Sequence, residues 1–149
     1  MGRVLRLQGG AVPHVTLFVD TSVWSLAFRR DADAATPEVS TLQHALDGAD
    51  QVFTTGLVLQ ELLQGFAGPK ARTQLIERFG ALGFLQPDRE DHIEAAEVRN
   101  TCRRHGVQIG TIDAVLIQLS LRHDLVLLSS DNDFRSAAKH IKFRLWRAQ

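Results

Sequence analysis

Two acidic residues follow apolar runs that have the character of buried strands. Asp20 comes directly after residues 15–19 (VTLFV), and Asp131 follows residues 124–128 (DLVLL) by two serines and so ends the same segment. Short β-branched runs of this kind are typical of strands covered on both faces. An α/β sheet keeps its ligand site beyond the carboxyl ends of its strands. The positions of Asp20 and Asp131 therefore predict a site at that edge, although an N-cap role is an equally good explanation for Asp20 taken alone.

Two further acids lie in unusually apolar helical segments. Glu61 stands within LVLQELL, and Asp113 within TIDAVLIQL, two residues after Thr111. A carboxylate on such a helix either faces water at a rim or is held by a cation, because an unpaired buried charge is costly. For Glu61 the structural and functional interpretations are evenly balanced. Asp113 also suits the first turn of a helix, where the dipole stabilises an acid by about 0.3–1 kcal/mol.

The segment Ser129–Asp133 (SSDND) adds a fifth acid, Asp133, two residues after Asp131. Either acid would cap the short helix that follows, but two acids exceed what one cap needs. Carboxylates gathered in one crevice repel one another unless a cation binds them. Hard oxygen ligands without a His/Cys cluster favour Mg²⁺ or Mn²⁺ over Zn²⁺. Such ions bind phosphate oxygens and activate water, so the chemistry indicated is hydrolysis of a nucleic-acid backbone.

The elements that would position these acids alternate between strands and helices. This alternation predicts an α/β fold with three α/β/α layers around a short central parallel sheet. Thr21 and Ser22 offer capping hydroxyls for the first helix. We expect strands at residues 15–19, 51–54, 83–86, 124–128 and 141–145, and helices at residues 23–28, 37–46, 57–63, 69–82, 88–105, 112–121 and 134–139.

Size and composition indicate an ordinary globular chain of 149 residues. We expect a flexible leader at residues 1–14, which lack the apolar stretch of a signal peptide, and a single domain at residues 15–149. Cys102 is the only cysteine, so no intramolecular disulfide is possible. No apolar run is long enough to span a bilayer, and a cytoplasmic location is expected. The net charge of zero excludes a long-range field that attracts nucleic acid.

Four segments together resemble the PIN-domain nucleases: VDTSVW at 19–24, QEL at 60–62, TIDA at 111–114 and LLSSDNDF at 127–134. Their order and spacing are similar to those of the VapC toxins of bacterial toxin–antitoxin pairs, from Val15 to the C-terminus. The resemblance implies an Mg²⁺- or Mn²⁺-dependent endoribonuclease that cuts structured RNA, often transfer or ribosomal RNA. It also implies a homodimer and a cognate antitoxin as partner.

The same resemblance assigns roles to individual residues. It makes Asp20, Glu61, Asp113 and Asp131 the catalytic, metal-binding acids. Asp133 would be an accessory acid, Ser129 a hydroxyl that supports the site, and Thr21 and Ser22 supporting groups near Asp20.

Basic residues follow the last acid of the chain. No Asp or Glu occurs after Asp133, whereas Arg135, Lys139 and Arg144 do, together with Lys142 and Arg147. These cations would suit an RNA backbone, since phosphate contacts supply much of nucleic-acid affinity. Solvated charges on a terminal helix and edge strand are the commoner explanation of such a run.

Two other functions remain open on the sequence. One is a different metal phosphohydrolase in which Asp20 forms an aspartyl-phosphate, but Ser22 stands where that chemistry commonly has a second acid. The other is a non-catalytic α/β module that binds a protein partner and uses its acids for capping and solubility. Metal binding by the acids separates the binding module from the nuclease hypothesis.

Overall fold

A computed structural model of the chain describes residues 15–29, 36–48 and 50–148. The leader predicted at residues 1–14 lies outside the described residues. The strands are β1 (Thr16–Val19), β2 (Gln51–Thr55), β3 (Gly83–Leu85), β4 (Val126–Leu128) and β5 (Arg144–Leu145). The helices are α1 (Thr21–Phe28), α2 (Pro37–Asp47), α3 (Gly56–Gly65), α4 (Pro69–Phe79), α5 (Arg89–Arg104), α6 (Thr111–His123) and α7 (Asn132–Ala137).

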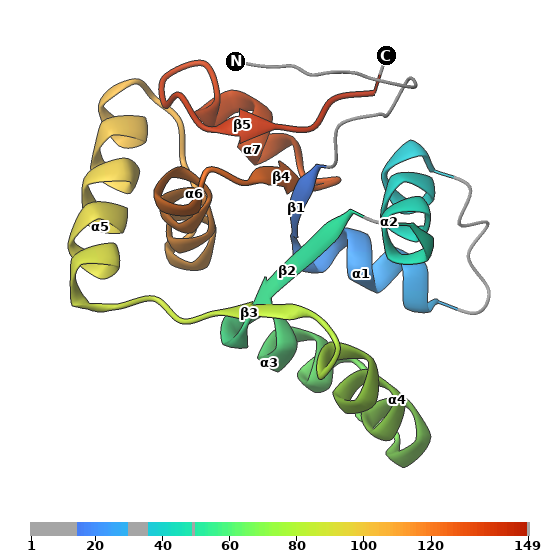
Figure 1. Cartoon of the computed structure of the whole chain (residues 1–149). Helices are drawn as coiled ribbons and strands as arrows, with labels where there is room; N and C mark the ends of the chain where they lie inside the picture. The colour runs from blue at the N-terminus through green and yellow to red at the C-terminus, as the bar shows by residue number, and fades with distance from the viewer. Residues whose placement is uncertain (1–14, 30–35, 49, 149) are drawn as a thin grey trace.

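The strands form one parallel sheet in the order β3-β2-β1-β4-β5. Central β1 is paired on both sides, with Leu17 opposite Val52 of β2 and Val126 of β4. The chain moves outward from β1 to β3, then returns across the sheet to β4 and β5. Because crossovers between parallel strands are right-handed, the outward and return helices cover opposite faces. Figure 1 accordingly shows α1 and α2 on one side of the sheet and α5 and α6 on the other. The predicted α/β fold with a parallel sheet flanked by helices is confirmed.

The core explains why the strand sequences are apolar without alternation. Leu17, Phe18 and Val19 of β1 and Leu127 and Leu128 of β4 are all buried, as expected for strands covered on both faces. Helix α6 is similarly apolar, and six of its residues are buried: Ala114, Val115, Leu116, Ile117, Leu119 and Ser120. The centre of the fold is thus rigidly packed beneath the strand ends that carry Asp20 and the 129–131 loop.

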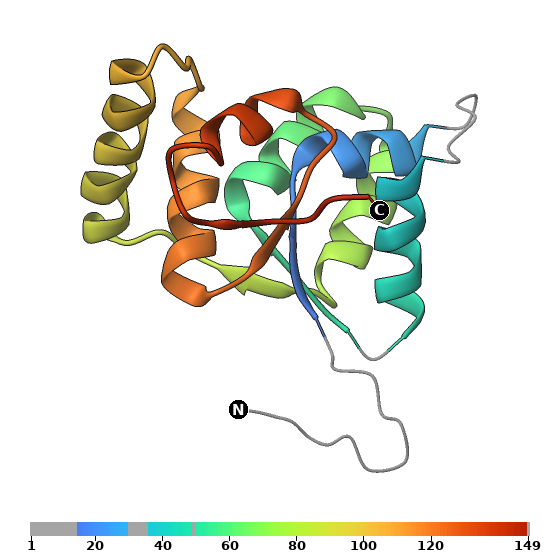
Figure 2. The same cartoon turned by 90° about the horizontal axis from the view of Figure 1, so that it is seen from above.

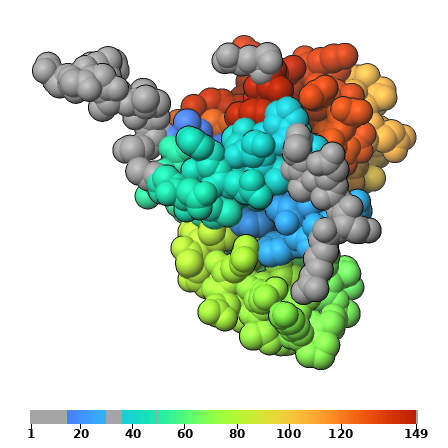
Figure 3. Space-filling view, turned by 90° about the vertical axis from the view of Figure 1, so that its right-hand side faces the viewer, coloured from blue at the N-terminus to red at the C-terminus, as the bar shows by residue number. Residues whose placement is uncertain are grey.

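Helices α5 and α6 lie side by side in both ribbon views (Figures 1 and 2). Asp91 in the first turn of α5 and Arg122 in the last turn of α6 connect the two helices through two hydrogen bonds of 2.8 Å. On the opposite face, α2 and α4 dominate the surface seen in Figure 3. None of the described helices combines the length and apolar character needed to cross a membrane.

Several predicted boundaries were wrong, among them β4, which begins at Val126 rather than 124, and α7, which covers Asn132–Ala137 rather than residues 134–139. The last strand covers only Arg144–Leu145 rather than residues 141–145, because the amide of Ile141 still bonds to Ala137 at the end of α7. Helix α4 ends at Phe79 rather than 82, where turn hydrogen bonds to Arg78 and Phe79 replace the helical pattern. Helix α1 begins at Thr21, with Asp20 rather than Thr21 or Ser22 as its N-cap.

Candidate active site

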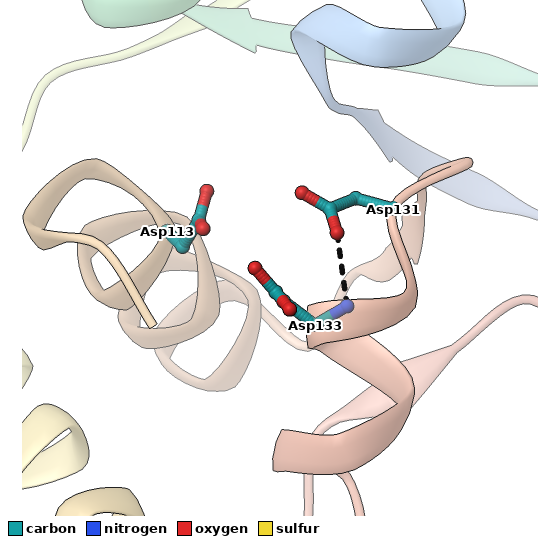
Figure 4. A group of neighbouring side chains, drawn as sticks. All are labelled: Asp113, Asp131 and Asp133. Atoms are coloured by element: carbon teal, nitrogen blue, oxygen red, sulfur yellow. Dashed lines mark hydrogen bonds between the residues drawn. The ribbon is translucent and has the colours of Figure 1, made fainter. Parts of the chain in front are cut away.

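Three aspartates meet where α6 approaches the loop after β4. Oxygen atoms of Asp113, Asp131 and Asp133 lie within 4.8 Å of one another (Figure 4). Asp113 comes from the first turn of α6, and Asp131 and Asp133 from the start of α7. Asp133 therefore belongs to the cluster itself, although the family resemblance implied only an accessory role for it.

Asp20 lies beside this cluster in a web of serine hydroxyls. The residue is 7% exposed, and its Oδ2 atom accepts hydrogen bonds from Ser22 Oγ at 2.8 Å and from Ser129 Oγ at 2.9 Å. Ser22 Oγ also accepts from the amide of Ser130, and Ser129 Oγ from the amide of Asp131. The two hydroxyls thus join the end of β1 to the loop after β4 and hold one carboxylate oxygen of Asp20 in place.

Glu61 reaches the site by a separate contact. Thr21 Oγ1 donates to Glu61 Oε1 at 2.7 Å, which connects α1 to α3. Thr21 was expected to support Asp20, but the structure pairs it with Glu61. Glu61 is half-buried and is not one of the three acids within 4.8 Å. Of the four acids predicted to be catalytic, Asp113 and Asp131 therefore lie close together and Asp20 lies beside them. Glu61 is connected to this group only through its hydrogen bond with Thr21, the residue after Asp20.

Capping and site membership are not alternatives for two of these acids. Asp131 caps α7 by accepting from the amide of Asp133 at 2.9 Å, and Asp20 caps α1 by accepting from the amide of Ser22 at 3.4 Å. A cap uses one carboxylate oxygen, and for Asp20 it is the oxygen that the serines already bind. The structural role therefore orients each acid instead of competing with a functional one.

The electrostatics of the cluster indicate unbalanced negative charge. Burial raises the pKa of Asp113 to about 6, together with the charges of Asp20, Asp131 and Asp133, while a hydrogen bond with the Gly110 backbone opposes the rise. No Lys or Arg of the described residues forms an ion pair with any of these acids. Carboxylates that share a site in this way are stabilised by a bound cation. The all-oxygen donor set fits a hard divalent cation.

The basic residues after Asp133 are placed in different ways. Arg135 and Lys139 are exposed on and after α7. Arg144 instead forms an ion pair with Asp124, at 3.2 Å, and donates to the Asp124 backbone oxygen. Asp124 precedes β4, so this pair lies at the amino end of the sheet, away from the acids. Arg144 thus has a partner at that end of the sheet, and the RNA contacts predicted for Arg135, Lys139 and Arg144 stay predictions.

A cavity of about 580 Å³ lies away from the acids, near the amino ends of β2 and β3. Trp24, Val52, Leu82 and Arg78 contribute to its walls. It contains none of the five acids discussed above. By its volume this cavity is a candidate ligand site. The acids whose charges influence one another lie at the other end of the strands, however, and acids with a shifted pKa are the better indicator of a catalytic site.

Comparisons with solved structures find the same fold in several chains. A chain in the crystal structure of FitAcB from Neisseria gonorrhoeae is 20% identical, with a TM-score of 0.65, and the match covers 89% of this chain and 97% of that one. A chain of VapBC2 from Rickettsia felis, bound to a promoter DNA fragment, is 15% identical with a TM-score of 0.67, covering 91% and 100%. VapC20 from Mycobacterium tuberculosis, described as a sarcin-ricin loop cleaving toxin, is 21% identical with a TM-score of 0.63, covering 87% and 99%.

At these identities the likeness establishes a shared fold and nothing finer. A search of curated proteins gave no match. The model of the PIN domain family, however, matches residues 17–140, which include all five acids and every strand except β5 and the first residue of β1. By this match and by its fold, the chain belongs to the PIN-domain family.

Proposed function

We propose that this protein is a metal-dependent endoribonuclease that acts as the toxin of a toxin–antitoxin pair. The observation that carries the proposal is the cluster of Asp113, Asp131 and Asp133, beside Asp20, on a PIN-domain fold. Capping explains Asp20 and Asp131 singly, but it does not explain why Asp113 and Asp133 face them, whereas carboxylates gathered in this way suit metal-assisted phosphodiester hydrolysis.

In this proposal Asp20, Glu61, Asp113 and Asp131 hold Mg²⁺ or Mn²⁺, with Asp133 in support. A bound ion of this kind lowers the pKa of its water and neutralises charge on the phosphate oxygens. The protein's own part is to hold the ligands in place: Ser22 and Ser129 fix one oxygen of Asp20, and Thr21 fixes one oxygen of Glu61. Such supporting contacts orient metal ligands and influence affinity strongly.

The substrate and partners are inferred from the related structures. VapC20 is described as cleaving the sarcin-ricin loop, which supports structured RNA as the substrate class. The FitAcB and VapBC complexes support an antitoxin as the protein partner. By the resemblance to VapC toxins, we also propose that the protein is a homodimer in the cytoplasm and that residues 15–149 form one nuclease domain.

The decisive experiment is RNA cleavage by the antitoxin-free protein with Mg²⁺ and with EDTA. Wild-type protein should cut a structured RNA, and both EDTA and Asp20→Asn should abolish cutting. Asp47→Asn is a matched control, because Asp47 is an exposed acid at the end of α2. Cleavage that survives EDTA and Asp20→Asn alike would refute the mechanism. No cleavage of any RNA, with antitoxin binding retained, would favour the non-catalytic binding module.

A further inference from the structure

Two basic segments that are far apart in the sequence meet at the protein surface. His105, the C-cap of α5, and His140, shortly after α7, stack their imidazole rings with centroids 4.3 Å apart and planes inclined by 19°. Figure 1 shows the end of α5 next to the red segment that follows α7. Both histidines are exposed. The exposed cations nearest to them in the two segments are Arg104, Lys139 and Lys142, and we call these three residues the basic patch.

Arg104 is held on the same side of α5 as the stacked rings. Arg104 Nη2 donates to Thr101 Oγ1 at 3.0 Å, and His105 Nδ1 lies 2.9 Å from the backbone oxygen of Thr101. Residues three and four positions apart share one face of a helix, so Arg104 and His105 both lie over Thr101. The Arg104 guanidinium therefore stands beside the point where the segment with Lys139 approaches α5.

The positive charge of the basic patch is not balanced by acids. None of its three cations forms an ion pair within the described residues. No Asp or Glu occurs at positions 98–112 or after 133. A helix dipole places only about half a negative charge at a C-terminus. Two cations stand at the end of each helix, Arg103 with Arg104 and Lys139 with Lys142, so most of their charge is left over. In a chain of zero net charge this excess is local, and it suits a polyanion.

Both segments of the basic patch continue directly into elements that carry the acids. Asp133 lies in the first turn of α7, and Lys139 follows the end of that helix. Because α7 has six residues, it spans roughly 9 Å. That length corresponds to about three nucleotides of stacked strand. On the other side, residues 105–110 join the end of α5 to α6, whose first turn holds Asp113.

We propose that Arg104, Lys139 and Lys142 bind phosphates of the RNA strand about three nucleotides from the cleaved phosphodiester. The stacked rings of His105 and His140 position these cations by holding the two segments together. The inference rests on the proposed function and names the surface along which the substrate extends from the acids. Contacts to phosphates carry no sequence information, so the basic patch supplies affinity and not base preference.

RNA binding without cleavage tests the basic patch. The metal-free protein is kept in EDTA and titrated with fluorescent oligouridylate at several NaCl concentrations, with anisotropy as the measurement. Each phosphate contact to a single strand contributes about 0.7 to the slope of log affinity against log salt. Arg104→Gln and Lys139→Gln should each lower this slope by about 0.7, and the double variant should lower it by about 1.4 and bind about 10-fold more weakly at 0.1 M salt.

Arg72→Gln is the matched control, because Arg72 is an exposed arginine on α4, which is well separated from α7 (Figure 1). It should leave the affinity and the slope unchanged. An unchanged slope in the double variant, or an equal loss in Arg72→Gln, would overturn the proposal. So would a loss of antitoxin affinity in the double variant with RNA affinity intact, since the basic patch would then be a protein contact.

The positioning role of the stacked rings is tested at pH 8, where imidazole charge does not contribute. His140→Ala should weaken RNA binding about 3-fold, because an aromatic pair is lost while all three cations stay. His140→Phe keeps a ring against His105 and should restore the affinity. Equal affinity in His140→Ala and the wild type would refute positioning by the stack.

RNA cleavage separates the basic patch from the proposed function. In a protein that cuts RNA, the double variant should raise KM and leave kcat nearly unchanged, because neither side chain belongs to the cluster of acids. An unchanged KM in such an enzyme would refute the patch and leave the nuclease intact. Weaker RNA binding by the double variant of a protein that never cuts RNA would support the patch and refute the nuclease.

Discussion

Asp91 and Asp113 are both aspartates withdrawn from solvent on the paired helices α5 and α6, yet their environments are opposite. Asp91 is 0% exposed and accepts hydrogen bonds from the Asp88 amide, from Gln118 and twice from Arg122. Burial alone would raise the pKa of Asp91, but these hydrogen bonds and the Arg122 charge hold it below its ordinary value. Asp113 has acids for neighbours, and its pKa rises to about 6.

The difference separates a structural acid from a functional one. Asp91 has a cation and several donors within the protein, so its charge is balanced and serves to join two helices. Asp113 meets Asp131 and Asp133, so its charge is balanced only by a proton or a bound cation. Burial of a carboxylate therefore says little about function until its partners are known.

The largest expected effect comes from removing the balanced acid. Asp91→Ala leaves Arg122 without its partner and breaks the capping box that Asp91 forms with Asp88. Loss of one member of a buried ion pair costs about 3–5 kcal/mol, and we expect the lower end because Arg122 is 39% exposed. Chemical denaturation should show this loss, whereas Glu90→Ala, in the same helical turn, should change the unfolding free energy by less than about 0.5 kcal/mol. A loss below about 1 kcal/mol would remove the contrast with Asp113.

A smaller effect of opposite sign is expected at the unbalanced acid. A carboxyl group whose pKa rises from 3.8 to about 6 on folding favours the protonated native state, so metal-free wild-type stability should fall between about pH 4 and pH 6 and stay lower above it. Asp113→Asn imitates the protonated form and should stabilise the metal-free protein at pH 7 by about 1–2 kcal/mol, after allowance for solvent screening. At pH 3.5 the two proteins should be equally stable.

Thermal unfolding across this pH range provides the measurement, and Mg²⁺ provides the second arm. The ion should stabilise the wild type more than Asp113→Asn, because only the wild type keeps the full set of carboxylates. If Asp113→Asn loses several kcal/mol without metal, Asp113 is a structural acid like Asp91.

The smallest effect is expected from the hydroxyls around Asp20. Ser129→Ala removes a donor to Asp20 and the acceptor for the Asp131 amide, so Mg²⁺ affinity measured by calorimetry should fall about 10-fold. The unfolding free energy should change by about 1 kcal/mol. Ser130→Ala is the matched control, since Ser130 contributes only its backbone amide to the web. Equal metal affinity in the two variants would mean that Ser129 does not position Asp20.

The sequence by itself determined the sheet and the place of its ligand site. Residues 17–19 and 125–128 are apolar without alternation, as strands covered on both faces require, and the acids that follow them had to lie at one edge of a parallel sheet. The family resemblance rested on those same segments. The position of a site at the strand ends can be predicted because parallel strands pair along their whole length, and the apolar pattern of each segment shows where its strand ends.

The tertiary structure decided which side chains meet. Helix α6 is apolar nearly all round, so its pattern does not specify the rotation that turns Asp113 toward Asp131 and Arg122 toward Asp91. Thr21 contacts Glu61 across 40 positions, a pairing set by how α1 packs on α3. The stacking of His105 on His140 likewise exists only where the end of α5 meets the segment after α7. Such contacts depend on helix rotation and separation, which packing of the whole core fixes and no single segment encodes.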